Sequence, residues 1–156
     1  MMSESTPVTL ILDAENIHYR LFRHPGPVHS VEQAARERGQ RPEQVVRSIL
    51  FRVVEGEYVM VLLAGPGQLS WSALRRFLGR SRVTLANEKE VLKITGYQLG
   101  SVSPFGIPAD IRILVDESVF AEEELSIGSG ERGTTVILKT QDLIHALSNP
   151  EIGQFR

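Results

Sequence analysis

The chain has 156 residues, of which 42% are hydrophobic and 23% charged, a balance typical of one globular domain, so we expect residues 1–156 to form a single domain. It contains no cysteine, which excludes disulfides, thiolate metal sites and cysteine nucleophiles. The net charge of −2 argues against a strong non-specific nucleic-acid binder. No apolar run reaches the roughly 18 residues that a membrane span needs, and no signal-peptide pattern opens the chain, so we expect a cytoplasmic protein.

Short helices and strands alternate in the first half of the chain. Thr6-Pro7 predicts the start of a helix, and an imperfect alternation over residues 17–22 predicts a strand. Ser30 precedes a second predicted helix. The clearest pattern is a hairpin with strands over Arg47–Val54 and Tyr58–Ala64. Its second strand is apolar at nearly every position, which predicts burial on both faces.

The second half contains further short elements of both kinds. We expect helices beginning after Ser70, after Asn87 and at Thr140, and strands over residues 83–85, 111–115, 125–127 and 134–138. Pro150 should end the last helix, and we expect the tail beyond it to be loose. The alternating elements predict an α/β fold.

The stretch Gly96–Pro108 holds three glycines and two prolines, a density that breaks both helices and strands. Its apolar side chains are too numerous for a solvated linker. One interpretation is an ordered loop that lines a pocket and offers backbone N–H groups to a ligand. The alternative, a rigid turn tucked under a sheet edge, fits the composition equally well.

A second glycine-rich loop, Gly128–Gly133, lies between two predicted strands. It spells G-x-G-x-x-G, but a strand follows it instead of the helix that a dinucleotide site requires, so composition alone favours a hairpin loop. The histidines lack metal-ligand spacing, so we expect no metal site. No G-x-S-x-G motif supports a conventional serine hydrolase.

Five segments together resemble one known family. They are Phe22–Pro25, Gln44–Phe51, Thr95–Gly106, Val115–Glu117 and Gly128–Gly133. In this order, and with the G-x-x-x-P spacing of the third segment, they resemble the YbaK/prolyl-tRNA synthetase-associated domain family over roughly residues 20–147. The resemblance implies a mixed, curved sheet or barrel with short peripheral helices. It also implies a freestanding deacylase, which hydrolyses the ester between a wrong amino acid and the 3′-terminal adenosine of a tRNA, most often the tRNA for proline.

The resemblance also assigns roles to residues. The catalytic group it implies is Arg47, Gly100, Ser101 and Val102, with backbone N–H groups of the loop facing the ester carbonyl. The substrate-binding residues it implies are Phe22, His24, Ser48, Ser103, Pro104, Phe105, Gly106, Gly128, Ser129 and Gly130. We expect no cofactor. The expected partner is the 3′ end of aminoacyl-tRNA, and prolyl-tRNA synthetase is a further candidate.

Arg47 departs from the family pattern, which has a functional lysine at this position before the serine or threonine that is Ser48 here. An arginine holds phosphate through two parallel hydrogen bonds, whereas lysine is a compact point charge. One interpretation is an active trans-acting deacylase in which Arg47 holds the terminal nucleotide. The alternative is a weakened or inactive module of the same fold that binds aminoacyl-tRNA or a nucleotide.

The charges are distributed unevenly along the chain. Residues 1–84 carry 11 arginines against 8 acidic residues, and the second half is acidic. If the substrate is a tRNA, the arginine-rich first half, including Arg75, Arg76 and Arg80, should form the contact face.

Overall fold

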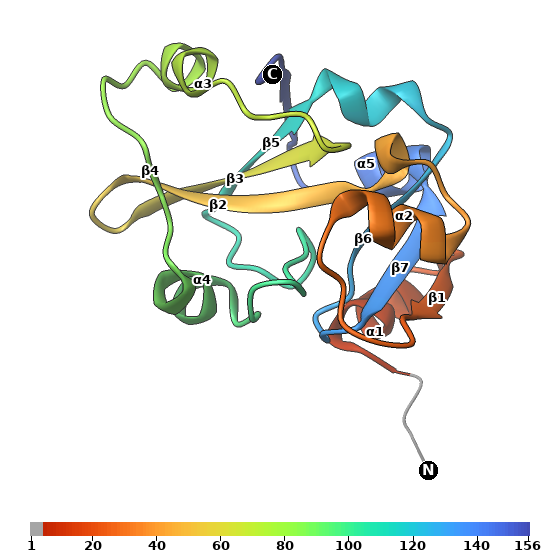
Figure 1. The fold of residues 1–156 in the computed structure, drawn as a ribbon. Coiled ribbons are helices and arrows are strands. Elements are labelled where there is room, and N and C mark those ends of the chain that lie inside the picture. The colour runs from red at the N-terminus through yellow and green to blue at the C-terminus, as the bar shows by residue number, and fades with distance from the viewer. Residues whose placement is uncertain (1–4) are drawn as a thin grey trace.

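Two β-sheets form the centre of the fold, which a computed structural model describes over residues 5–156 (Figure 1). The smaller sheet is antiparallel and has the order β1 (Arg20–Arg23), β7 (Thr134–Lys139), β6 (Glu124–Gly128). The larger has the order β4 (Thr84–Leu85), β2 (Val46–Val54), β3 (Glu57–Ala64), β5 (Arg112–Asp116), β8 (Glu151–Gly153). The predicted mixed α/β fold is therefore confirmed, but the strands of the described residues form two sheets and no closed barrel.

Short helices surround the sheets. They are α1 (Pro7–Ala14), α2 (Val31–Arg38), α3 (Trp71–Leu78), α4 (Glu88–Thr95) and α5 (Thr140–Ala146), with 3₁₀ turns η1 (Pro42–Gln44) and η2 (Glu117–Ala121). Polar caps start four of them, as the sequence predicts: the side chains of Thr6, Ser30, Ser70 and Asn87 each accept an N–H three residues on. No helix within residues 5–156 has the length and apolarity to cross a membrane.

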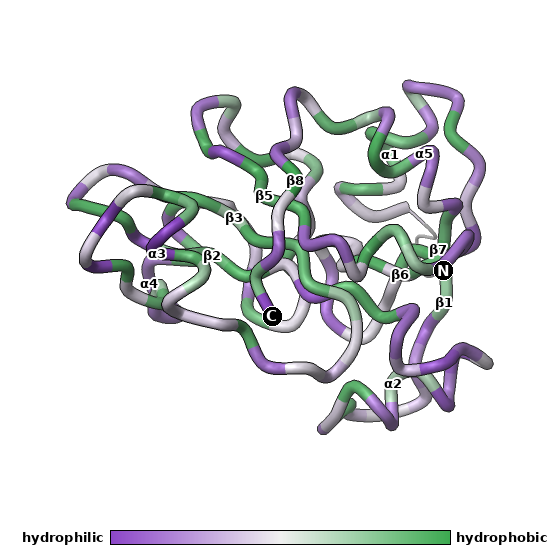
Figure 2. The backbone as a smooth tube through the Cα atoms, turned by 90° about the horizontal axis from the view of Figure 1, so that it is seen from above, coloured by the Kyte–Doolittle hydropathy of each residue, from purple (hydrophilic) through white to green (hydrophobic). Residues whose placement is uncertain are grey.

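The hairpin of β2 and β3 carries the hydrophobic core on both of its faces. Val59 and Val61 pack in a cluster with Leu74 of α3. Met60 and Leu62 point the opposite way, into the cluster that contains Val91 of α4. The two helices accordingly lie on opposite sides of the hairpin (Figure 1), and most residues of β3 are hydrophobic (Figure 2). The continuous apolar run thus reflects burial on both faces, as predicted.

The C-terminal segment is ordered, so the expectation of a loose tail is wrong. β8 pairs in parallel with β5, and the side chain of Phe155 is fully buried. Its backbone N–H donates to Asp116 Oδ1 at 2.6 Å, and its ring meets Phe77 of α3 edge to face. One aromatic anchor and a buried carboxylate hold a segment too short to show a pattern in the sequence.

The two sheets meet at the beginning of β2. A single parallel bridge joins Val45 to Ser126 of β6, which brings the first residues of β2 beside the end of β6 and the beginning of β7. The glycine-rich stretch after α4 packs against this junction through Gly128, as described below. The fold thus brings together three segments that lie about 30 to 80 residues apart in the chain.

Candidate active site

A cavity of about 240 Å³ opens at the junction of the two sheets. The start of β2, the loop after α4, the end of β6 and the start of β7 all contribute to its wall. The lining residues are Arg38, Val45, Val46, Arg47, Ser48, Leu99, Gly100, Val102, Ile127, Gly128, Thr134 and Thr135. Five of the residues implied by the family resemblance lie among them: Arg47, Ser48, Gly100, Val102 and Gly128.

Arg47 and Ser48 both line this cavity, and each has a buried polar atom without a hydrogen-bond partner among residues 5–156. The Arg47 Nη2 donates to the carbonyl oxygen of Gly67, but its Nε is buried and has no hydrogen-bond partner among residues 5–156. The Ser48 hydroxyl is in the same situation. Buried polar groups are nearly always paired, so two unpaired ones in residues that line the same cavity set this wall apart. Burial lowers the pKa of the Arg47 guanidinium, and the nearby charge of Arg156 lowers that pKa further.

The two glycine-rich loops pack directly against each other at one edge of the cavity. A Cβ atom on Gly128 would lie 2.0 Å from the carbonyl oxygen of Val102, so only glycine fits there. The Gly130 N–H donates to the Ser101 carbonyl at 2.9 Å, and this hydrogen bond joins the two loops next to the contact between Gly128 and Val102. Within the described chain, the N–H groups of Gly100 and Val102 have no hydrogen-bond partner. The loop therefore presents free backbone donors beside the cavity.

Other expected site residues lie behind this wall and support the loops. Ser101 is buried and donates through its hydroxyl to the Gln98 carbonyl at 2.8 Å. Ser129 is buried too, with its hydroxyl hydrogen-bonded to that of Thr134. Outside the lining are Ser101, Ser103, Pro104, Phe105, Gly106, Ser129 and Gly130. The structure does not bring these seven into contact with the cavity, and their observed contacts are those of a scaffold.

Phe22 and His24 lie on or just after β1, also outside the cavity lining. The ring of His24 meets that of Phe22 edge to face, and its side chain is only 2% exposed. Its Nδ1 lies 2.7 Å from Glu37 Oε1, and its Nε2 accepts from Arg38 Nε at 3.0 Å. Accepting that bond requires an unprotonated Nε2, so Nδ1 carries the proton and donates to Glu37. His24 acts here as a support for Arg38.

Arg38 is a cavity residue that the sequence did not indicate. Besides its bond to His24, it donates through Nη1 to the Ser126 hydroxyl at 2.9 Å. Burial lowers the pKa of its guanidinium to about 10, which still leaves it charged at neutral pH. A basic residue in the last turn of a helix usually serves the helix dipole, so no local pattern marks its role. Thr134 and Thr135 also line the cavity without having been predicted. They directly follow the loop Gly128–Gly133, so the family resemblance did indicate the neighbouring segment.

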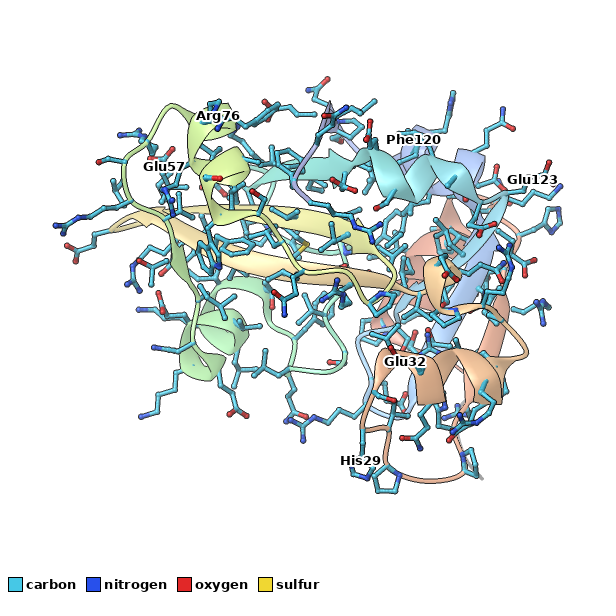
Figure 3. All side chains as sticks on the ribbon, turned by 45° about the horizontal axis from the view of Figure 1, so that its top comes forward. His29, Glu32, Glu57, Arg76, Phe120 and Glu123 are labelled. Carbon is cyan, nitrogen blue, oxygen red and sulfur yellow. The ribbon has the colours of Figure 1, made fainter. Side chains whose placement is uncertain are left out.

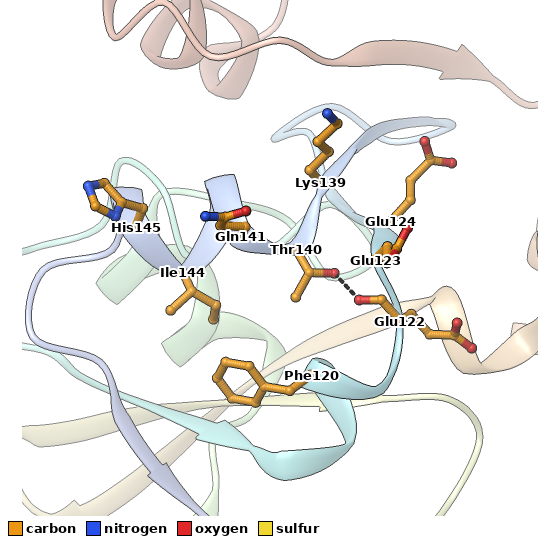
Figure 4. Close-up of a pocket in the computed structure, with 9 residues that line it drawn as sticks. All are labelled: Phe120, Glu122, Glu123, Glu124, Lys139, Thr140, Gln141, Ile144 and His145. Carbon is orange, nitrogen blue, oxygen red and sulfur yellow. Dashed lines mark hydrogen bonds between the residues drawn. The ribbon is translucent and has the colours of Figure 1, made fainter.

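A larger hollow, of about 900 Å³, lies elsewhere, around η2 and α5 (Figure 4). Phe120 of η2 and Ile144 of α5 face each other within it (Figure 4), and Glu123 lies at its rim (Figure 3). Its carboxylates are partly committed, since Glu122 pairs with Arg41 and Glu124 with Arg20. None of the residues implied by the family resemblance lines it. Its acidic rim disfavours a substrate that carries phosphate, so the smaller cavity is the candidate active site.

Known proteins resemble this chain over most of its length. The family described as "Aminoacyl-tRNA editing domain" matches residues 25–146, a range that includes the lining of both the smaller cavity and the larger hollow. A proline–tRNA ligase of Aquifex aeolicus (strain VF5) is 28% identical over 108 residues, which are 69% of this chain but 19% of the ligase. The chain therefore spans about a fifth of that relative. The multifunctional Ser/Thr-tRNA deacylase ProXp-y of Escherichia coli (strain K12) is 27% identical over 150 residues, covering 94% of this chain and 89% of the deacylase.

Solved structures show the same fold. One of them, whose assignment as a trans-editing enzyme for prolyl tRNA synthetase is itself provisional, matches with a TM-score of 0.87 and 22% identity over 100% of this chain and 99% of its own. The crystal structure of hypothetical protein APE2540 matches with a TM-score of 0.84 and 23% identity over 95% of this chain and 97% of its own. At these identities the likeness concerns the fold. With the family match over most of the sequence, the chain belongs to the aminoacyl-tRNA editing domain family.

Proposed function

We propose that this chain is a trans-acting aminoacyl-tRNA deacylase, which hydrolyses the ester that joins an amino acid to the 3′-terminal adenosine of a tRNA. One observation carries the proposal. In a member of the editing family, one cavity is lined by Arg47 and Ser48, each with an unpaired buried polar atom, and by Gly100 and Val102, whose N–H groups are free. The E. coli deacylase, similar over nearly its whole length, supports an activity that needs no attached synthetase.

The size of the cavity indicates how the substrate lies. Pockets that enclose drug-sized ligands measure roughly 300–1,000 Å³, so about 240 Å³ accommodates an aminoacyl group but no nucleotide. The amino acid therefore enters, and the terminal adenosine stays at the mouth. Arg47, which is charged and part-buried, is placed to hold a phosphate of that nucleotide.

Hydrolysis in this arrangement depends on positioning. As water attacks, negative charge develops on the ester carbonyl oxygen, and backbone N–H groups such as those of Gly100 and Val102 stabilise it. The products are the free amino acid and a tRNA with its terminal hydroxyl restored. None of the cavity-lining side chains is a histidine or a carboxylate that could act as general base. The attacking water or substrate hydroxyl would be oriented by the pocket.

Substrate choice follows from the same cavity. Its mixed lining of aliphatic side chains and threonines selects by size and by one or two hydrogen bonds, and size discrimination is weak per methylene group. We favour mischarged tRNA for proline as the substrate, and prolyl-tRNA synthetase as a partner, because proline–tRNA ligases are among the relatives. The cytoplasm, where translation uses aminoacyl-tRNA, is the expected location.

A second candidate function is a binding module that retains aminoacyl-tRNA without hydrolysing it. The specific observation in its favour is that Arg47, at the position of the family's lysine, already gives one donor to the Gly67 carbonyl. A guanidinium held by this hydrogen bond can adjust its position to the substrate less than the ammonium group of a flexible lysine side chain would.

The test is a deacylation assay over a panel of tRNAs for proline that carry amino acids of increasing size. We expect the native chain to release at least one wrong amino acid well above the spontaneous rate and to leave correctly charged tRNA intact. Tight binding of the panel without any release would favour the binding module.

A further inference from the structure

The guanidinium of Arg156 lies against Gly67, which is in the loop between β3 and α3. A Cβ atom placed on Gly67 would lie 2.3 Å from Arg156 Nη2 and 2.7 Å from both Nε and Cζ of that guanidinium. Contact with three atoms of the group means that it occupies the space a side chain at residue 67 would take. This close approach is possible only because residue 67 is a glycine.

Arg47 reaches the same glycine from the cavity. Its Nη2 donates to the Gly67 carbonyl, so two guanidinium groups converge on one residue. Neither arginine forms an ion pair with a side-chain carboxylate within 4.0 Å among the described residues, although Asp116 and Glu117 line one hollow together with Arg156. Two like charges close together repel each other unless an anion lies between them. The geometry is that of an anion site whose counter-charge comes from a ligand.

We propose that Arg156 and Arg47 form a two-arginine clamp for a phosphodiester at the 3′ end of the tRNA. The clamp rests on the proposed function, because Arg47 also lines the candidate active site. Arginine matches phosphate oxygens through paired donors, and two arginines can hold both free oxygens of one phosphodiester. The α-amino group of an aminoacyl ester is cationic, so the two arginines repel the aminoacyl end of the substrate while they attract its phosphodiester. Arg156 thereby sets the direction in which the acceptor end enters.

Two substitutions separate the position of the guanidinium from its charge. Arg156→Gln removes the charge. Gly67→Ala keeps the charge but displaces the guanidinium, since the new Cβ occupies its place, and Gly67 has no positive φ that alanine would strain. The matched controls are Gly26→Ala, where a Cβ meets nothing within 4 Å, and Arg36→Gln, which is exposed on α2.

The measurement is the affinity of an uncharged RNA minihelix ending in CCA, taken over a range of salt concentrations. We expect Arg156→Gln and Gly67→Ala each to weaken binding about three- to tenfold, the range between an exposed ion pair and a charge-assisted hydrogen bond. The slope of log affinity against log salt should become shallower by about 0.7 in Arg156→Gln, as for one single-stranded phosphate contact. The double variant Arg156→Gln with Gly67→Ala should have an affinity no lower than that of the single variant with the lower affinity. Both control variants should have the affinity of the native chain.

Several outcomes would overturn the clamp. Native affinity and salt slope in both variants would exclude it. A loss in Arg156→Gln without a loss in Gly67→Ala would place the Arg156 contact away from Gly67. By contrast, if the native chain hydrolyses no mischarged tRNA yet both variants weaken minihelix binding, the clamp stands and the proposed hydrolysis fails.

Discussion

The Ser48 hydroxyl is expected to affect the stability and the activity of the chain in opposite directions. Its hydroxyl is buried in the cavity wall, and it has no hydrogen-bond partner among residues 5–156. A buried hydroxyl without a partner costs free energy of folding, because it has lost its hydrogen bonds to water. We expect the substrate to supply the missing partner.

We therefore expect Ser48→Ala to be at least as stable as the native chain and less active. Removing the unpaired hydroxyl should leave the free energy of unfolding unchanged or raise it by up to about 1 kcal/mol. Deacylation of a mischarged tRNA should slow about tenfold, the effect of one lost hydrogen bond in the substrate complex. Urea unfolding and single-turnover hydrolysis measure the two effects.

Ser126→Ala is the matched control, because Ser126 is fully buried and its hydroxyl accepts from Arg38 Nη1. Its loss leaves a charged donor unpaired and should destabilise the chain by about 1–3 kcal/mol. A similar loss of stability in Ser48→Ala would mean that the Ser48 hydroxyl is satisfied within the protein, against our account.

At the scale of residues, what the sequence could predict depended on the role of each residue. Arg47, Ser48, Gly100 and Gly128 belong to segments with a recognisable order, and all four line the cavity. Ser129, in one of the same segments, has its hydroxyl engaged with Thr134. Whether a hydroxyl faces a cavity or a neighbour depends on contacts between strands, which no local pattern encodes. The place of Arg38 in the cavity could not be predicted for the same reason, because its partners His24 and Ser126 are distant from it in the sequence.

Helix α4 owes its start to a set of charged and polar contacts. The Asn87 side chain accepts from the Glu90 N–H at 2.9 Å, and Glu90 Oε1 accepts from the Asn87 N–H at 3.1 Å. The second carboxylate oxygen of Glu90 accepts from Arg52 Nη1 and from the Tyr58 hydroxyl on the neighbouring hairpin. The backbone bond from Asn87, followed by the bond from Arg52, lowers the pKa of Glu90.

This lowered pKa makes a prediction about acid stability. A carboxyl whose pKa is lower in the folded chain stabilises it above the unfolded-state pKa, about 4.3 for Glu, and the contribution disappears as pH falls through the folded-state value. Glu90→Gln should therefore be less stable at neutral pH. Its unfolding midpoint should also fall less steeply than that of the native chain below about pH 5.

Urea unfolding at several pH values tests this, with Glu32→Gln as the control, because Glu32 is exposed in the first turn of α2. Parallel pH curves for the native chain and Glu90→Gln would show that these contacts contribute nothing. Because α4 lies away from the cavity lining, deacylation should not change.

At the scale of elements, the sequence predicts what local chemistry determines. Caps such as Asn87 and the apolar run of β3 are visible in a few consecutive residues, and both elements form as expected. The strand β8 is invisible in the same way, because three residues carry no period. It exists through its pairing with β5 and the burial of Phe155, which are contacts at long range.

At the scale of the whole molecule, the arginine-rich residues 1–84 contribute both to the candidate active site and to the surface of helix α3. Helix α3 follows the loop that contains Gly67, and Arg76 projects from it into solvent (Figure 3). Arg75 and Arg76 have no carboxylate within 4.0 Å among residues 5–156, whereas Arg80 pairs loosely with Glu57 at 3.5 Å. Unpaired surface arginines on one helix suit the phosphate backbone of an acceptor stem.

Reversing these charges should weaken tRNA binding. We expect Arg75→Glu with Arg76→Glu to reduce the affinity for tRNA about tenfold or more at low salt, and the difference should narrow as salt rises. The control reverses Lys89 and Lys93 of α4, on the opposite side of the β2–β3 hairpin. Equal losses in both pairs would show that binding reflects net charge rather than a defined face.

The central claim is that an arginine supports hydrolysis at this cavity, and Arg47 tests it most directly. The measurement is single-turnover deacylation of a mischarged tRNA by the native chain, Arg47→Lys and Arg47→Ala. We expect the native chain to be active, the lysine variant to retain measurable activity and the alanine variant to be about one to two orders of magnitude slower. That loss corresponds to a charge-assisted interaction worth roughly 1.5–3 kcal/mol. A native chain that is inert while Arg47→Lys gains activity, or three equally inactive forms, would contradict the account.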